Sequence, residues 1–225
     1  MAELYLVRHA QASFGSTNYD KLSPLGQQQS VWLGEYYQQR GIKFDSIVTG
    51  AMVRHRETAK SICHGLNIKT AEFDVLDELN EFDFQALVKA YIGKHPEDAI
   101  APNASASEHY RLLKKTLHCW SLGKLSINIT ETWQQFEQRV QWALGHIQEK
   151  YHGQKVLAVS SGGAISMALR QIIQAPSKTA IELNMQIKNT AVSHFFFNSR
   201  AFRLTTFNHV PHLDSLNRLD KVTFS

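Results

Sequence analysis

Short apolar runs that each pass into a helical pattern are the feature of this sequence that most restricts its fold. Residues 4–7, 44–50 and 155–161 have the composition of buried strands. Amphipathic stretches follow the second and third of them, at 51–66 and 163–173. Strands that alternate with helices predict an α/β fold, here a three-layer sandwich with a mostly parallel central sheet flanked by helices.

Local signals place the remaining elements of this predicted fold. Ser23 and Pro24 start a helix that Gly41 ends, and its apolar face is expected to carry Leu25, Gln29, Trp32, Leu33 and Tyr36. Thr132 with Gln135 predicts a capping box and a long helix that follows it. Residues 84–130 are less regular and are interpreted as a helical insertion, while 190–198 and 202–208 form a closing pair of strands. We interpret residues 1–225 as a single domain.

Composition narrows the class of protein. A chain of 225 residues that is 43% hydrophobic can bury one sizeable core. Its net charge of +4 is scattered, with no basic run longer than Lys114–Lys115, so nucleic acid is not the expected partner. No apolar stretch has the length of a membrane span or of a signal-peptide core. Cys63 and Cys119 form no CxxC pair and are expected to be reduced, and a cytoplasmic protein without a membrane partner is predicted.

Polar residues with catalytic side chains follow the predicted strands. Ligands of α/β sheets bind at the carboxyl ends of the strands. In chain order, the predicted strands are followed by Arg8–His9, by Thr49–Gly50 shortly before Arg54, and by residues 160–163. An imidazole, two guanidiniums and a loop carboxylate suit phosphoryl transfer, because arginines bind non-bridging oxygens and a carboxyl group can protonate a leaving oxygen. Spacing alone leaves a second interpretation open, a structural histidine beside a solvated arginine.

Several motifs in one order resemble the histidine phosphatase superfamily, the phosphoglycerate mutase-like proteins. "LYLVRHAQAS" is similar to the N-terminal signature, which usually reads Arg-His-Gly, and "LSPLGQQQS" is similar to the following helix start. "RHRETA" resembles Arg-Ala-x-Glu/Gln-Thr-Ala, and "LNEFDF" resembles the segment that bears the acid. "NTAVSHF" and "FNHVPHL" resemble the closing strands and tail, so the resemblance covers almost the whole chain and implies a phosphoglycerate mutase-like fold.

The resemblance implies roles for the basic residues. His9 is the predicted nucleophile that becomes phosphohistidine, and Arg8 is its phosphate-binding neighbour. The second phosphate-binding arginine is predicted to be Arg54, because it shares a helix face with Thr58 of the motif. Arg56 lies two positions further on, roughly 200° around the helix, so both cannot face one pocket.

The acid has two candidates. Glu78 and Glu81 each end a Leu-x-Glu pattern, and the Phe-Asp-Phe that follows Glu81 makes it the closer match. Glu81 is therefore the predicted catalytic acid.

Ser161 departs from the family. Members usually carry a second histidine after this strand, and "VSSGG" puts Ser161 at that position. Ser161 can still donate one hydrogen bond, and the Gly162 amide at a helix N-terminus can face an anion. The departure predicts weakened catalysis, and it also predicts that Ser161→His raises turnover if the turn presents this side chain to the phosphate.

The function implied by the resemblance is a metal-independent phosphomonoesterase that acts through phosphohistidine on His9 and needs no cofactor. Its expected partner is a small phosphorylated substrate or phosphate, with a homodimer left open. The alternative is a non-catalytic phosphate-ligand or protein-binding module on the same fold. A serine hydrolase is disfavoured because the Ser161 turn lacks Gly-x-Ser-x-Gly. His209 and His212 have no further ligand at a spacing that would complete a metal site.

Overall fold

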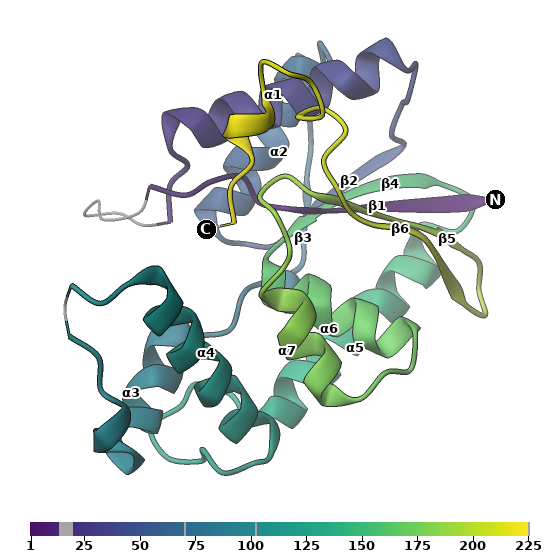
Figure 1. The fold of residues 1–225 in the computed structure, drawn as a ribbon. Helices are drawn as coiled ribbons and strands as arrows, with labels where there is room; N and C mark the ends of the chain where they lie inside the picture. The colour runs from purple at the N-terminus through teal and green to yellow at the C-terminus, as the bar shows by residue number, and fades with distance from the viewer. Residues whose placement is uncertain (14–19, 70, 102, 225) are drawn as a thin grey trace.

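The computed structural model describes residues 1–13, 20–69, 71–101 and 103–224, and its centre is one six-stranded sheet (Figure 1). The strand order is β3-β2-β4-β1-β5-β6. Strands β1, β2, β3 and β4 are parallel, whereas β5 and β6 run antiparallel at one edge. The strands span β1 Ala2–Arg8, β2 Ser46–Thr49, β3 Asp74–Val75, β4 Lys155–Ser160, β5 Val192–Phe197 and β6 Phe202–His209. The mostly parallel sheet predicted from the sequence is confirmed.

Helices cover both faces of the sheet. Helices α1 (Pro24–Gln39) and α2 (Val53–Gly65) lie on one face, and α5 (Trp133–Lys150), α6 (Gly162–Ile172) and α7 (Ser177–Asn184) lie on the other (Figure 1). Helices α3 (Phe84–Lys94) and α4 (Ala106–Ser121) extend from the second layer. Buried apolar side chains form two clusters, one including Leu33 and Ile62 on the α1–α2 side and one including Phe136 and Ile147 on the other. The predicted three-layer sandwich is therefore confirmed.

Helix starts follow the predicted signals. The Ser23 hydroxyl accepts a hydrogen bond from the Gly26 amide at the start of α1. Thr132 and Gln135 form the predicted capping box of α5. Each cap satisfies backbone amides that have no partner within the helix.

The buried face of α1 differs from the predicted one. Leu33 and Gln29 are buried, but Leu25, Trp32 and Tyr36 are only half-buried. The fully buried face includes Gly26, Ser30, Gly34 and Tyr37.

Close packing of α1 against α2 explains this difference, because the two helices touch through glycines. A Cβ on Gly34 would lie 2.1 Å from the Ile62 carbonyl oxygen, and one on Gly65 would lie 2.2 Å from that of Val31.

The C-terminal segment covers the outer side of α1 (Figure 1). The guanidinium of Arg218 lies 4.5 Å from the centre of the Trp32 ring, a cation–π arrangement. The Gln29 side-chain amide donates to the Lys221 carbonyl at 2.7 Å. Trp32 therefore faces this segment instead of the sheet, which explains why the helical pattern alone assigned it to the core.

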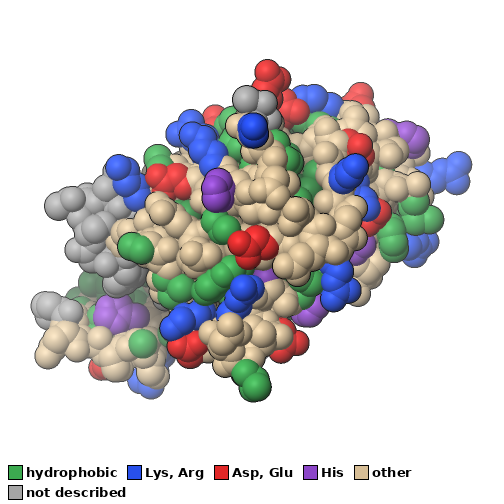
Figure 2. All heavy atoms as spheres, turned by 90° about the horizontal axis from the view of Figure 1, so that it is seen from above, with side chains coloured by type: hydrophobic (Ala, Val, Ile, Leu, Met, Phe, Trp, Pro, Cys, Tyr) green, Lys and Arg blue, Asp and Glu red, His purple; other side chains and the backbone are tan. Residues whose placement is uncertain are grey.

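Within the described residues, one strand and one α-helix were not predicted, and both are short. Strand β3 has two residues, too few to show a periodicity, and α7 has eight. No helix in the described part of the chain has the length and apolar character needed to cross a membrane. On the face seen in Figure 2, basic and acidic side chains are interspersed.

Substituting Gly34 by Ala should destabilise the protein, because the new methyl group would force α1 away from α2. Overpacking of this kind costs about 1–3 kcal/mol. Gly145 is the matched control, since it lies within α5 and an added Cβ would meet no other atom within 4 Å. Gly145→Ala should instead stabilise the protein by about 0.5–1 kcal/mol. Urea unfolding of both variants checks this, and equal effects would contradict the close helix contact.

Candidate active site

The pairing of β1 with β4 brings two predicted site segments together. The strands are parallel, with Arg8 in register with Ser160, and the His9 amide donates to the Ser160 carbonyl at 2.8 Å. Residues 8–9 and 160–161 therefore leave the same edge of the sheet side by side. Strand β2 pairs with β4 in the same sense, so the Thr49–Gly50 turn ends at this edge as well.

His9 is buried with a defined tautomer. Its Nδ1 lies 2.8 Å from the Ala10 carbonyl oxygen, which can only accept, so Nδ1 carries the proton and Nε2 keeps its lone pair. Burial, then the charges of Arg54 and Arg8 and the neighbouring His55, lowers the His9 pKa well below the usual value. The imidazole is therefore neutral at pH 7 and carries its lone pair on Nε2.

A turn after α7 holds the backbone at His9 through hydrogen bonds to the Arg8 and His9 carbonyl groups. The Asn189 side-chain amide donates to the His9 carbonyl at 3.1 Å, and the Thr190 amide donates to the Arg8 carbonyl at 3.1 Å. Thr190 has a φ of 55°, a left-handed conformation that is unfavourable for a β-branched residue. Its hydroxyl contacts His212 Nε2 at 2.8 Å. His212 therefore supports the turn that holds the predicted nucleophile, and the sequence hinted at this only through the "NTAVSHF" and "FNHVPHL" motifs.

Arg54 points into the same edge from the first turn of α2. Its side chain is buried and its two terminal nitrogens reach Asp20 Oδ1 at 2.8 Å and Ser161 Oγ at 3.5 Å. Asp20 Oδ2 also accepts from the Val53 amide at 2.8 Å, and so caps α2. Arg56 is exposed on the other side of the helix. Asp20, which sequence reasoning missed, thus orients Arg54.

Arg8 and the start of α6 form another wall. The Arg8 Nη1 atom donates to the Phe224 carbonyl at 2.6 Å and to the Ile187 carbonyl. A Cβ on Gly162 would lie 3.5 Å from Arg8 Nε and 2.7 Å from Asn184 Oδ1. Gly162 therefore leaves space for the side chain of Asn184, next to Arg8 at the N-terminus of α6.

The Glu81 carboxylate sits at the N-terminus of α6. It accepts from the Gly163 amide at 3.0 Å and from the Phe82 amide at 3.2 Å. A Cβ on Gly163 would lie 2.1 Å from Glu81 Oε1, so only glycine permits this approach. Glu78, the other candidate acid, is half-buried on the 3₁₀ turn Asp77–Leu79, where its backbone carbonyl accepts from Arg139.

His55 joins the site without having been predicted. It is fully buried, and its Nε2 lies 2.6 Å from Ser161 Oγ. Its ring centre is 5.7 Å from that of His9. Burial and the charge of Arg54 lower its pKa to about 3, so it is neutral at pH 7. The one available signal was a histidine inside the "RHRETA" motif at the position where the family pattern has alanine.

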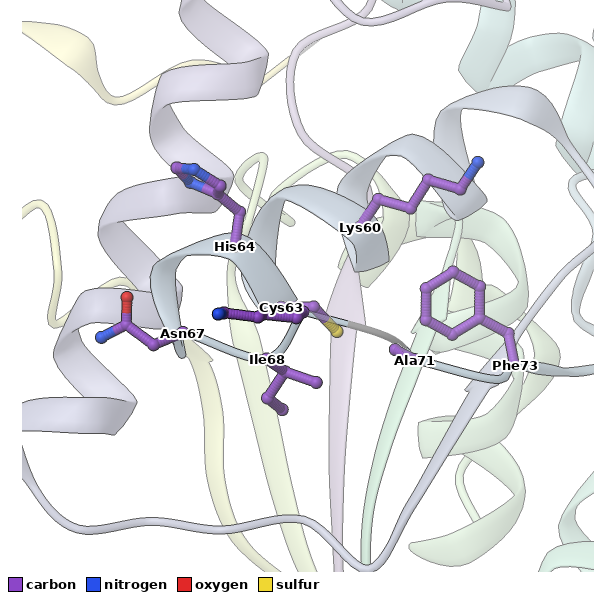
Figure 3. A pocket seen from close by; sticks show the side chains of 8 residues that line it. Lys60, Cys63, His64, Asn67, Ile68, Ala71 and Phe73 are labelled. Atoms are coloured by element: carbon purple, nitrogen blue, oxygen red, sulfur yellow. The ribbon is translucent and has the colours of Figure 1, made fainter.

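A hollow of the surface lies away from these residues. About 640 Å³ opens beside the last turns of α2, lined by residues that include Lys60, Cys63, His64 and Phe73 (Figure 3). None of the predicted site residues lines it. No group of three or more potential metal-binding side chains occurs within the described ranges.

The chain matches one family model over nearly its whole length. The model, described as histidine phosphatase superfamily (branch 1), matches residues 4–210. The chain belongs to the histidine phosphatase superfamily. The resemblance inferred from the motifs is thereby confirmed.

A curated relative and two solved structures resemble this chain over almost its full length at low sequence identity. The uncharacterized phosphatase PhoE of Bacillus subtilis is 24% identical over 220 residues, covering 95% of this chain and 97% of that protein. Phosphoserine phosphatase of Entamoeba histolytica, solved with 3-phosphoglyceric acid, superposes with a TM-score of 0.66 at 20% identity, covering 95% and 100% of the two chains. Phosphoglycerate mutase of Bacillus anthracis gives 0.66 at 18%, covering 94% of each. These structures share the fold.

Three buried imidazoles should make the stability of the protein depend on pH. The pKa values of His55 and His212 are lowered to about 3 by burial and nearby cationic groups, and that of His9 lies well below 6.5. Each pKa is lower in the folded than in the unfolded state, so unfolding takes up protons below about pH 6.5 and stability falls as the pH falls. The loss is at most about 1.4 kcal/mol per pH unit for each imidazole.

Urea unfolding between about pH 7 and about pH 5 measures this slope, in a range where carboxylates contribute little. His212→Gln is the control, because it removes one of the three groups and should lower the slope by about a third whatever its absolute stability. A slope of zero in the wild type would contradict the neutral buried imidazoles.

Proposed function

We propose that the protein is a metal-independent phosphomonoesterase that forms phosphohistidine on His9. The observation that carries this proposal is the protonation of His9: a buried, neutral imidazole with its proton on Nδ1 beside the Arg8 and Arg54 guanidiniums. A nitrogen lone pair next to two fixed positive charges suits attack on a phosphate monoester, whose own charge would otherwise repel a nucleophile.

In the first step His9 Nε2 attacks phosphorus, and the bond from phosphorus to the leaving oxygen breaks. Arg8, Arg54, Ser161 and the Gly162 amide at the start of α6 hold the non-bridging oxygens. Glu81, whose carboxyl group contacts the Gly163 amide at the start of α6, donates a proton to the leaving alcohol oxygen.

In the second step water attacks the phosphohistidine. The Glu81 carboxylate accepts a proton from this water, the bond from phosphorus to Nε2 breaks, and inorganic phosphate is released. His9 is then neutral again and Glu81 is protonated, so the cycle balances without a cofactor. Relatives named as phosphatases, one of them solved with 3-phosphoglyceric acid, support a small phosphorylated substrate.

Rapid mixing with a ³²P-labelled phosphoester followed by acid-free quenching at alkaline pH should trap label on the wild-type chain, since phosphohistidine survives alkali. His9→Ala should carry no label and lose turnover to background. Label that persists in His9→Ala would contradict the proposal. Background turnover in the wild type, with a phosphate-induced rise in melting temperature, would instead support the non-catalytic binding module.

Glu81→Gln should slow the enzyme in proportion to the basicity of the leaving group. Loss of a general acid costs about 10²–10⁴ in rate for an alkyl phosphate, but much less for an aryl phosphate whose leaving group needs no proton. Glu78→Gln is the matched control and should change neither rate by more than about twofold, because its carboxyl group is assigned no role. Equal losses on both substrates would exclude Glu81 as the acid.

A further inference from the structure

His55 and Ser161 are joined across the site from different layers of the fold. His55 projects from α2, whereas Ser161 follows β4, 106 positions later in the chain. Both side chains are fully buried, and the 2.6 Å between His55 Nε2 and Ser161 Oγ is a short hydrogen bond. A polar pair that is buried this completely, beside Arg54 and within one ring contact of His9, calls for an explanation beyond packing.

The backbone leaves room for this imidazole at one particular place. A Cβ on Gly50 would lie 2.2 Å from His55 Nδ1 and 2.8 Å from Asn80 Oδ1. Any other residue at position 50 would therefore displace the His55 ring. Gly50, His55 and Ser161 fit one another as a set, contributed by the end of β2, the start of α2 and the end of β4.

We propose that His55 is a positioning residue that orients Ser161 as a phosphate-binding donor. It supplies from α2 the imidazole that the family resemblance placed at position 161. In this arrangement His55 Nε2–H donates to Ser161 Oγ, and Ser161 directs its own hydrogen at a phosphoryl oxygen. The proposal rests on the proposed function for the identity of the bound group.

Hydrogen-bond counting supports this direction of donation. A hydroxyl has two lone pairs and one hydrogen. Arg54 Nη2, 3.5 Å away, can only donate, so it faces one lone pair of Ser161 Oγ, and His55 Nε2–H faces the other. The hydroxyl hydrogen is then left for a third group. The opposite tautomer would place the proton on His55 Nδ1, which has no hydrogen-bond partner among the described residues, and buried N–H groups are seldom left unpaired.

The arrangement also revises the expectation for position 161. With His55 in place, a histidine side chain at 161 would overlap its ring, since only 2.6 Å separates the present atoms. Ser161→His alone should therefore lower turnover, whereas adding His55→Ala removes the overlap and should restore it. The site thus has room for one imidazole, which can come from position 55 or from position 161.

The test is a double-mutant cycle with kcat/KM for one phosphoester. Ser161→Ala and His55→Leu should each lower kcat/KM by about 10²–10³, as for loss of one preorganised donor. The double variant should be no worse than the poorer single one, because the two residues act as a unit.

Two further variants are controls. His55→Gln, which keeps an N–H near the position of Nε2, should retain most of the activity that His55→Leu loses. His64→Leu, on the exposed side of the same helix, should leave kcat/KM unchanged.

A second readout separates this inference from the proposed function. Inorganic phosphate should raise the melting temperature of the wild type and of His55→Gln, and this rise should be lost in Ser161→Ala and His55→Leu, even if the wild type shows no turnover. The proposal would be wrong if the losses of kcat/KM in the two single variants were additive in the double variant, or if His55→Gln were as impaired as His55→Leu. The proposal would also be wrong if His9 is labelled in the wild type but Ser161→Ala keeps the wild-type kcat/KM and the wild-type response to phosphate. In that case the proposed function would still hold, without a role for the pair.

Discussion

The parallel pairing of β1 with β4 is the constraint on which the rest of the site depends. The pairing aligns Arg8 with Ser160 and continues through the hydrogen bond from the His9 amide to the Ser160 carbonyl. Both strands are buried on both faces, so a shift of register would break two cores at once. The helices that follow β2 and β4 then deliver Arg54 and the start of α6 to the same edge. The sheet and the helices that follow its strands thus set the positions of these residues, whereas Asp20 and Glu81 come from connecting segments.

Positive charge is concentrated around an imidazole that is kept neutral. Two guanidiniums and burial all disfavour protonation of His9, while the Ala10 carbonyl holds the proton that remains on Nδ1. Asp20 balances part of the charge of Arg54 and fixes its direction. The strained Thr190, held by His212, secures the backbone on the other side. These contacts hold the His9 imidazole and the Arg54 guanidinium in place, so the proposed binding of a phosphate would require little reorganisation.

Much of the fold followed from the sequence because strands, caps and helix ends have local signals. The caps at Ser23 and Thr132 are examples, since each depends on residues within three positions. The α1 face was misassigned because the segment that covers Trp32 comes from the far end of the chain. At the site, strand ends and motifs were sufficient to predict five residues, namely Arg8, His9, Arg54, Glu81 and Ser161. His55 was missed because its partner lies 106 positions away and only tertiary structure pairs them.

The space above Gly50 has a consequence for how such a site could arise. An imidazole at position 55 and a side chain at position 50 exclude each other, because a Cβ would come within 2.2 Å of the ring. With a larger residue at position 50, a histidine at position 55 would therefore have to place its ring elsewhere. Glycine at position 50 is thus a condition for the present contact between His55 and Ser161.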